Sequence, residues 1–180
     1  MTAHHIMLQF IATRDHKLMR KVNKWPAPKW IRLWALAATR AGDGWLWYLV
    51  GLIVLLFGGP ERLLALGTAG SAALVGVGLF IAIKKVSGRK RPCEIEPHCW
   101  AHLLPPDQFS FPSGHTITAF AVAVALGMFY PMFLAVLLFC ALSIAVSRIL
   151  LGMHFLSDVV VGALIGTGLA WSSHSLFARV

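Results

Sequence analysis

Three ionisable residues, Arg148, His154 and Asp158, lie in a strongly apolar stretch of the chain. An Arg or Asp near the middle of a membrane helix costs about 2.5–3.5 kcal/mol to insert, so such residues usually face a bundle interior or a polar cavity. His154 and Asp158 are four residues apart, a spacing that places them on one face of a helix. A carboxylate beside one imidazole nitrogen leaves the other nitrogen available for nucleophilic attack or proton transfer. The spacing therefore favours a catalytic pair.

A second cluster, Pro112-Ser113-Gly114-His115, precedes another apolar run and is typical of a helix start. Ser113 can cap the helix, and Gly114 lets the backbone approach a ligand closely. The free N–H groups and the helix dipole together favour an anion at this position. His115 could donate a proton to a leaving oxygen.

A third cluster follows the apolar run that ends near Lys84 and continues to Arg91-Pro92. Arg offers a two-pronged fork for phosphate oxygens, and Lys offers a compact point charge. The alternative is a basic patch beside the membrane that attracts anionic headgroups, to which Lys85, Arg89 and Lys90 would also belong. Both interpretations can hold, because only two or three of these side chains need to enter a site.

The three clusters together supply two imidazoles, one carboxylate, three cations and backbone donors. This set suits phosphoryl transfer without a metal ion or other cofactor, in which cations hold the phosphoryl oxygens while nucleophile and leaving group lie in line. The polar loop at 87–113 adds further ligand-type side chains without zinc spacing, so no metal site is predicted there: Glu94, Glu96, His98 and His102. Cys93 and Cys99 in that loop could form a disulfide in an oxidising compartment.

The composition assigns the chain to the integral membrane proteins. Of its 180 residues, 58% are hydrophobic and only 13% are charged, which is unlike a soluble domain. The formal net charge of +9 favours anionic lipid surfaces or anionic substrates. A basic stripe with interleaved aromatic residues is absent, so nucleic acid is not an expected partner.

The pattern of apolar runs predicts an all-α membrane bundle that forms a single domain over residues 1–180. About five transmembrane helices are expected in the bundle at 43–180: Trp45–Phe57, Leu63–Val86, Gly114–Tyr130, Met132–Leu151 and His154–Trp171. The segment 1–42 is amphipathic and basic, and its stretch 29–40 predicts a helix in the membrane interface, with a short first span as the alternative. This topology brings the three clusters to one membrane surface. A Gly162-x-x-x-Gly166 spacing predicts a close-packing helix face.

On these residues the chain resembles the type 2 phosphatidic acid phosphatase superfamily of lipid phosphatases. That family has a Lys separated by six residues from Arg-Pro, then Pro-Ser-Gly-His, then Ser-Arg with a downstream His and Asp. The same motifs stand here in the same order as Lys84…Arg91-Pro92, Pro112–His115 and Ser147-Arg148…His154…Asp158.

The resemblance implies that His154 attacks phosphorus to form a phosphohistidine, that Asp158 orients it, and that His115 protonates the leaving group and then activates water. It implies that phosphoryl oxygens are held by a further set of residues: Lys84, Arg91, Ser113, Gly114 and Arg148. No metal is required in the family.

The substrate stays open among undecaprenyl pyrophosphate, phosphatidylglycerophosphate, phosphatidic acid and a lipid A phosphate. Two other functions also stay open: transfer of the phosphoryl group to another lipid, and binding or transport of anionic lipids without catalysis. The resemblance implies a bacterial inner membrane with the site facing the periplasm. The many basic residues on the site's own side point instead to a cytoplasmic face by the positive-inside rule.

Overall fold

The computed structural model of the protein describes residues 3–96 and 108–177, and nearly all of these residues are helical. The helices, in chain order, are α1 (Ala3–Asn23), α2 (Lys29–Ala41), α3 (Trp45–Phe57), α4 (Arg62–Ser87), α5 (Pro92–Ile95), α6 (Gly114–Phe129), the 3-10 turn η1 (Pro131–Phe133), α7 (Leu134–Leu150) and α8 (Leu156–Phe177). Within the described ranges, the β pairing is limited to an isolated bridge between Lys90 and Phe109. The predicted all-α class is confirmed.

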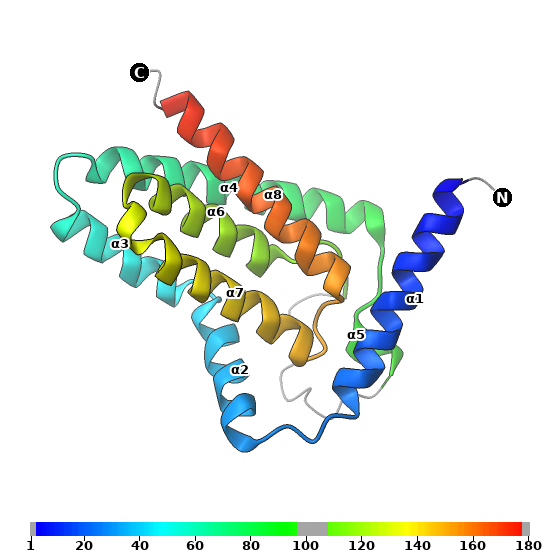
Figure 1. The fold of residues 1–180 in the computed structure, drawn as a ribbon. Helices are drawn as coiled ribbons and strands as arrows, with labels where there is room; N and C mark the ends of the chain where they lie inside the picture. The colour runs from blue at the N-terminus through cyan, green and yellow to red at the C-terminus, as the bar shows by residue number, and fades with distance from the viewer. Residues whose placement is uncertain (1–2, 97–107, 178–180) are drawn as a thin grey trace.

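Helix α6 forms the centre of the bundle, with α4, α7 and α8 packed around it (Figure 1). Its alanines at 119, 121, 123 and 125 are fully buried although they point in different directions around the helix. Small side chains allow helices to approach closely in a membrane, where packing rather than burial from water drives association. The outer faces of the surrounding helices carry exposed large apolar residues such as Leu74, Phe139 and Leu164, as a lipid-facing surface requires.

Among the residues that the structure describes, three helical segments are long and apolar enough to cross a membrane: α4, Pro131–Leu150 and α8. Helices α2 and α3 meet at a 60° bend and provide a fourth crossing if the pair counts as one broken span. Each of the five predicted spans coincides with a helix of the bundle. Helices α3 and α6, however, have only 13 and 16 residues, short of the roughly 20 that a full crossing needs. Length and composition therefore support three or four spans.

The last span differs from its predicted bounds of 154 and 171. Helix α8 begins at Leu156, so His154 stands in the turn before it, and it continues to Phe177. The polar residues after Trp171 do not end it, because Ser172 bonds to the carbonyl of Gly168 inside the helix and His174 packs against Phe129 with ring centroids 5.1 Å apart. The premise that His154 and Asp158 share a helix face is therefore wrong.

The ends of the helices that carry the three motifs lie at one end of the molecule. Helix α5, the end of α4, the end of α7 and the beginning of α8 gather there, beside α1, whereas the α3–α4 turn and η1 lie at the other end (Figure 1). Motifs that are far apart in sequence thus reach the same region of the bundle.

The predicted Gly162–Gly166 face packs directly on α6. A Cβ at Gly166 would clash with the carbonyl oxygen of Ile117, and a Cβ at Gly162 would lie 2.9 Å from the carbonyl oxygen of Ser113. By contrast, a Cβ at Gly168 meets nothing within 4 Å. The close-packing prediction is confirmed.

We expect Gly166→Ala to lower the melting temperature in detergent by about 3–10 °C, because overpacking a tight contact costs roughly 1–3 kcal/mol. The matched variant Gly168→Ala should leave the melting temperature unchanged or slightly raised, since Ala favours helix. Equal melting temperatures for the two variants would contradict the close α6–α8 contact.

Candidate functional site

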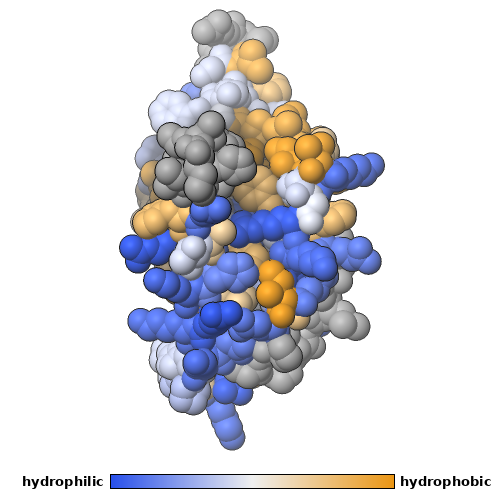
Figure 2. Space-filling view, turned by 90° about the vertical axis from the view of Figure 1, so that its right-hand side faces the viewer, coloured by the Kyte–Doolittle hydropathy of each residue, from blue (hydrophilic) through white to orange (hydrophobic). Residues whose placement is uncertain are grey.

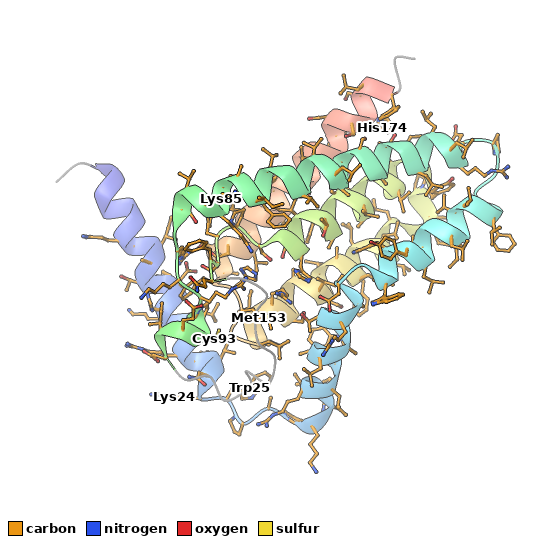
Figure 3. All side chains as sticks on the ribbon, turned by 180° about the vertical axis from the view of Figure 1, so that it is seen from behind. Lys24, Trp25, Lys85, Cys93, Met153 and His174 are labelled. Atoms are coloured by element: carbon orange, nitrogen blue, oxygen red, sulfur yellow. The ribbon has the colours of Figure 1, made fainter. Side chains whose placement is uncertain are left out.

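The three motifs meet around a cavity of about 640 Å³. Six of the predicted site residues line it: Lys84, Arg91, Gly114, His115, Arg148 and His154. Met153, which precedes His154, lies at the same end of the molecule as Cys93, whereas His174 marks the opposite end (Figure 3). Hydrophilic side chains gather over much of the end face near α1 (Figure 2). The basic residues of α1, including Arg14, Lys17 and Lys21, are exposed.

A tight turn between α7 and α8 places His154. Gly152 takes a φ of 66°, in the left-handed region that favours glycine, and the N–H groups of Met153 and His154 both donate to the carbonyl of Arg148. The turn is hydrogen-bonded to the segment around Arg91, since the Cys93 N–H donates to the Gly152 carbonyl and Arg91 Nη1 donates to the Met153 carbonyl at 2.8 Å. These bonds fix the backbone on either side of His154, whose side chain is buried with 2% of its surface exposed.

The hydrogen bonds of His154 determine which ring nitrogen carries the proton. Nδ1 lies 2.6 Å from the carbonyl oxygen of Ser110, an atom that only accepts, so Nδ1 carries the proton. Nε2 then holds the lone pair and lies 3.3 Å from Nη1 of Arg91. Burial lowers the pKa of His154 to about 3, with Arg148 and Arg91 acting in the same direction. The ring is neutral at physiological pH, with a nucleophilic nitrogen toward the cations.

Asp158 lies behind His154 and is fully buried. Its Oδ2 accepts the Phe155 N–H at 2.8 Å and stands 3.7 Å from Nδ1 of His154, beyond hydrogen-bond distance. The direct partner of Nδ1 is the Ser110 carbonyl. The orienting role of Asp158 therefore stays a prediction, with the carboxylate acting on the ring through its charge at 3.7 Å.

Arg89 neutralises Asp158 and links it to the N-terminal helix. Its Nη1 donates to Oδ1 of Asp158 at 2.6 Å and to the Ser157 hydroxyl at 2.7 Å, while Nη2 donates to Oδ2 of Asp15 at 2.7 Å. Asp15, on α1 and only 4% exposed, also accepts the Ser157 N–H at 3.1 Å. The guanidinium lies over the Phe155 ring, 4.2 Å from its centroid. Arg89 is therefore more than a member of a surface basic patch.

Three cationic side chains line the same cavity as His154. Lys84, Arg91 and Arg148 are 8%, 1% and 3% exposed, and all three line the cavity. Nη1 of Arg148 donates to the Thr39 hydroxyl at 2.6 Å, and Nζ of Lys84 lies over the Phe80 ring. Helix α4 ends at Ser87, so Lys84 and Arg91 belong to different segments rather than to two turns of one helix. Three buried positive charges that line one cavity favour the binding of an anion there.

The α6 N-terminus supplies the remaining predicted groups. Gly114 lines the cavity and opens the helix, with a Cβ at that position only 3.1 Å from the Phe80 ring. Ser113 is fully buried and does not line the cavity, and its hydroxyl accepts a bond from Thr116 at 2.9 Å. Its contact with a phosphoryl oxygen stays a prediction.

His115 also lines the cavity, and its Nε2 lies 2.8 Å from Oδ1 of Asp43. The sequence around Asp43 predicted only a turn. The sequence thus offered no sign of four residues that hydrogen-bond with the site residues or with Arg89, namely Asp15, Thr39, Asp43 and Arg89, apart from the concentration of charge near the motifs.

The polar loop lies partly outside the described residues, which end at 96 and resume at 108. The predicted Cys93–Cys99 pairing, His98 and His102 therefore fall where the structure describes nothing. Among the described residues, no group of three or more His, Cys, Asp or Glu side chains could hold a metal ion.

The chain is similar to proteins of known name. The PAP2 superfamily model matches residues 61–180. Decaprenylphosphoryl-5-phosphoribose phosphatase of Mycobacterium tuberculosis is 37% identical over 124 residues, which span 68% of this chain and 66% of that protein, just under two thirds of its length. Lipid A 1-phosphatase of Rhizobium johnstonii is 28% identical over 87% of this chain and 71% of that protein. The crystal structure of Aquifex aeolicus LpxE superimposes with a TM-score of 0.73 at 27% identity, covering 88% and 93% of the two chains.

We expect Arg89→Gln to lower the melting temperature in detergent by about 5–10 °C. The substitution leaves the buried Asp158 carboxylate without its cation, and breaking a buried pair costs about 3 kcal/mol. Lys85→Gln, in the same basic run but exposed on α4 (Figure 3), is the matched control and should change little. If the two variants melt alike, Arg89 is only a member of the basic patch.

Proposed function

Because the chain belongs to the PAP2 superfamily, we propose that it is a membrane enzyme that removes a phosphate group from a lipid through a phosphohistidine. The observation that carries this function is the fixed tautomer of His154, whose Nε2 lone pair faces a cavity lined by three buried cations. The phosphatase names of the relatives support the same reaction class.

The proposed reaction has two steps. In the first, Nε2 of His154 attacks phosphorus, the bond from phosphorus to the leaving oxygen breaks, and His115 gives that oxygen a proton. In the second, His115 takes a proton from water, the hydroxide attacks phosphorus, and the P–N bond breaks to release inorganic phosphate.

Each cation has a part in both steps. Lys84, Arg91 and Arg148 hold the phosphoryl oxygens as negative charge moves between them and the leaving group. The imidazole ring of His154 becomes positively charged when its Nε2 bonds to phosphorus. The hydrogen bond that Nδ1–H donates to the Ser110 carbonyl and the negative charge of Asp158 stabilise that charged ring. No step needs a metal ion.

The shape of the cavity supports a lipid substrate. From the cations it extends between α3, α4 and α6, where its wall is apolar: Trp47, Leu66, Ala69, Gly70, Ala73, Leu74, Val77, Val122 and Leu126. A headgroup at the cations would thus place a hydrocarbon tail against these residues. The substrate class that fits is a lipid phosphate monoester or diphosphate, which includes polyprenyl, glycerophospholipid and lipid A phosphates.

We propose that the protein lies in a bacterial inner membrane, because it has helices long and apolar enough to span a membrane and the similar phosphatases are bacterial. The periplasmic orientation implied by the family resemblance stays a prediction.

We expect purified protein to release inorganic phosphate from lipid mono- or diphosphates in the presence of EDTA. His154→Gln should lower this rate at least about 1,000-fold while the protein keeps its melting temperature, because the variant lacks the nucleophile. The panel to use is undecaprenyl pyrophosphate, phosphatidylglycerophosphate, phosphatidic acid and a lipid A phosphate.

Three results would contradict the proposal: an active, folded His154→Gln, activity lost on chelation and restored by a divalent cation, or lipid binding without phosphate release. Addition of an acceptor lipid distinguishes transfer from hydrolysis, since transfer yields a phosphorylated acceptor in place of inorganic phosphate.

The tail-binding part of the cavity is testable at Gly70. A Cβ at Gly70 or at Gly78 meets nothing within 4 Å, and both glycines lie on α4, but only Gly70 lines the cavity. We expect Gly70→Leu to lower kcat/KM for a long-chain lipid phosphate about 10-fold or more, with a much smaller effect on a short-chain analogue. Gly78→Leu is the matched control. Equal effects on both chain lengths would place the tail elsewhere.

A further inference from the structure

The corner between α2 and α3 places a second carboxylate beside the second imidazole of the site. Asp43 Oδ1 lies 2.8 Å from Nε2 of His115, and both residues line the cavity. Asp43 precedes residue 61, where the family match begins, so none of the family motifs includes it. We propose that Asp43 positions His115 and stabilises its protonated form, so that His115 can act as the proton donor. This inference rests on the proposed function.

The backbone around Asp43 is built for this contact. Gly44 has a φ of 117°, which a residue with a side chain rarely adopts, so the chain can turn sharply into α3. A Cβ at Gly42 would lie 2.8 Å from Ile144 and 3.3 Å from the His115 ring. The two glycines that flank Asp43 thus allow a sharp turn and a close approach to His115.

The charges in the cavity explain why His115 needs a carboxylate. Arg148 and Lys84 line the same cavity, and like charges nearby disfavour an imidazolium. Asp43 is the carboxylate in contact with the ring, at hydrogen-bond distance, and it offsets the effect of these cations. With Nε2 directed to Asp43, the transferable proton is the one on Nδ1.

The same corner also reaches a phosphate-binding cation. The Thr39 hydroxyl, 1% exposed near the end of α2, accepts a bond from Arg148 at 2.6 Å. The segment from Thr39 to Gly44 therefore contacts two residues that line the cavity, His115 and Arg148, although it precedes all three motifs in the chain. This second contact supports a functional rather than an incidental role for the corner.

The test compares two leaving groups. An alkyl phosphate, dioctanoyl phosphatidic acid, needs its leaving oxygen protonated, whereas p-nitrophenyl phosphate releases a stable phenolate. General acid catalysis contributes about 10²–10⁴-fold. We expect Asp43→Asn to lower kcat/KM for the alkyl phosphate about 10–100-fold and for the aryl phosphate less than about threefold. The constant kcat/KM is used because it reports the steps up to leaving-group departure.

Two further variants complete the design. The double variant Asp43→Asn/His115→Asn should lose no more activity than His115→Asn alone, since Asp43 acts through His115. Glu61→Gln, an exposed carboxylate at the start of α4, is the control and should retain full activity on both substrates. Melting temperatures check that each variant folds.

Equal losses on the two substrates, or additive losses in the double variant, would overturn the proposal and leave Asp43 a structural role. Unchanged kcat/KM in Asp43→Asn would overturn it as well. Absence of phosphate release by the wild-type protein from both substrates is a different result, because it would overturn the proposed function itself.

Discussion

Charges buried at the end of an apolar helix bundle must be stabilised by one another, and this constraint explains most of the site. Asp158 is fully buried, and it tolerates that position because Arg89 and the Phe155 N–H bind its two oxygens. Arg89 in turn binds Asp15 of α1, so an N-terminal helix is tied to the end of the molecule that holds the candidate site. Asp158 and Asp15 are thus engaged with Arg89 outside the cavity lining, and the charged side chains described along the cavity are three cations, Lys84, Arg91 and Arg148, together with Asp43.

This arrangement gives the two imidazoles different environments. His154 is buried behind Arg91, donates Nδ1–H to a carbonyl and is neutral, as a nucleophile must be. His115 contacts the half-exposed Asp43, whose negative charge favours the protonated form that a proton donor needs. Two residues of one type therefore take opposite parts in the proposed reaction because of their partners, with the cations between them reserved for the phosphoryl group.

The sequence was sufficient to predict the fold class, the positions of the bundle helices and six of the residues that line the cavity, although Ser113 and Asp158 do not line it. These features come from local patterns, such as apolar runs and motif spacing. The sequence was insufficient to predict the turn that places His154 before the start of α8, and it did not predict the hydrogen-bond partners of the site residues. Arg89 and Asp15 are 74 positions apart, Asp43 and His115 are 72 apart, and Arg148 and Thr39 are 109 apart. Contacts over such separations depend on how whole helices pack, which no local pattern specifies.

The central claim is that Nε2 of His154 forms a bond to phosphorus, and rapid acid-free quenching with a lipid substrate labelled in its phosphate tests it most directly. The account predicts a label on the protein that is stable in alkali, labile in acid and located on His154 by peptide mapping. A label on any other residue, or full turnover by a chain in which His154 is never labelled, would contradict it.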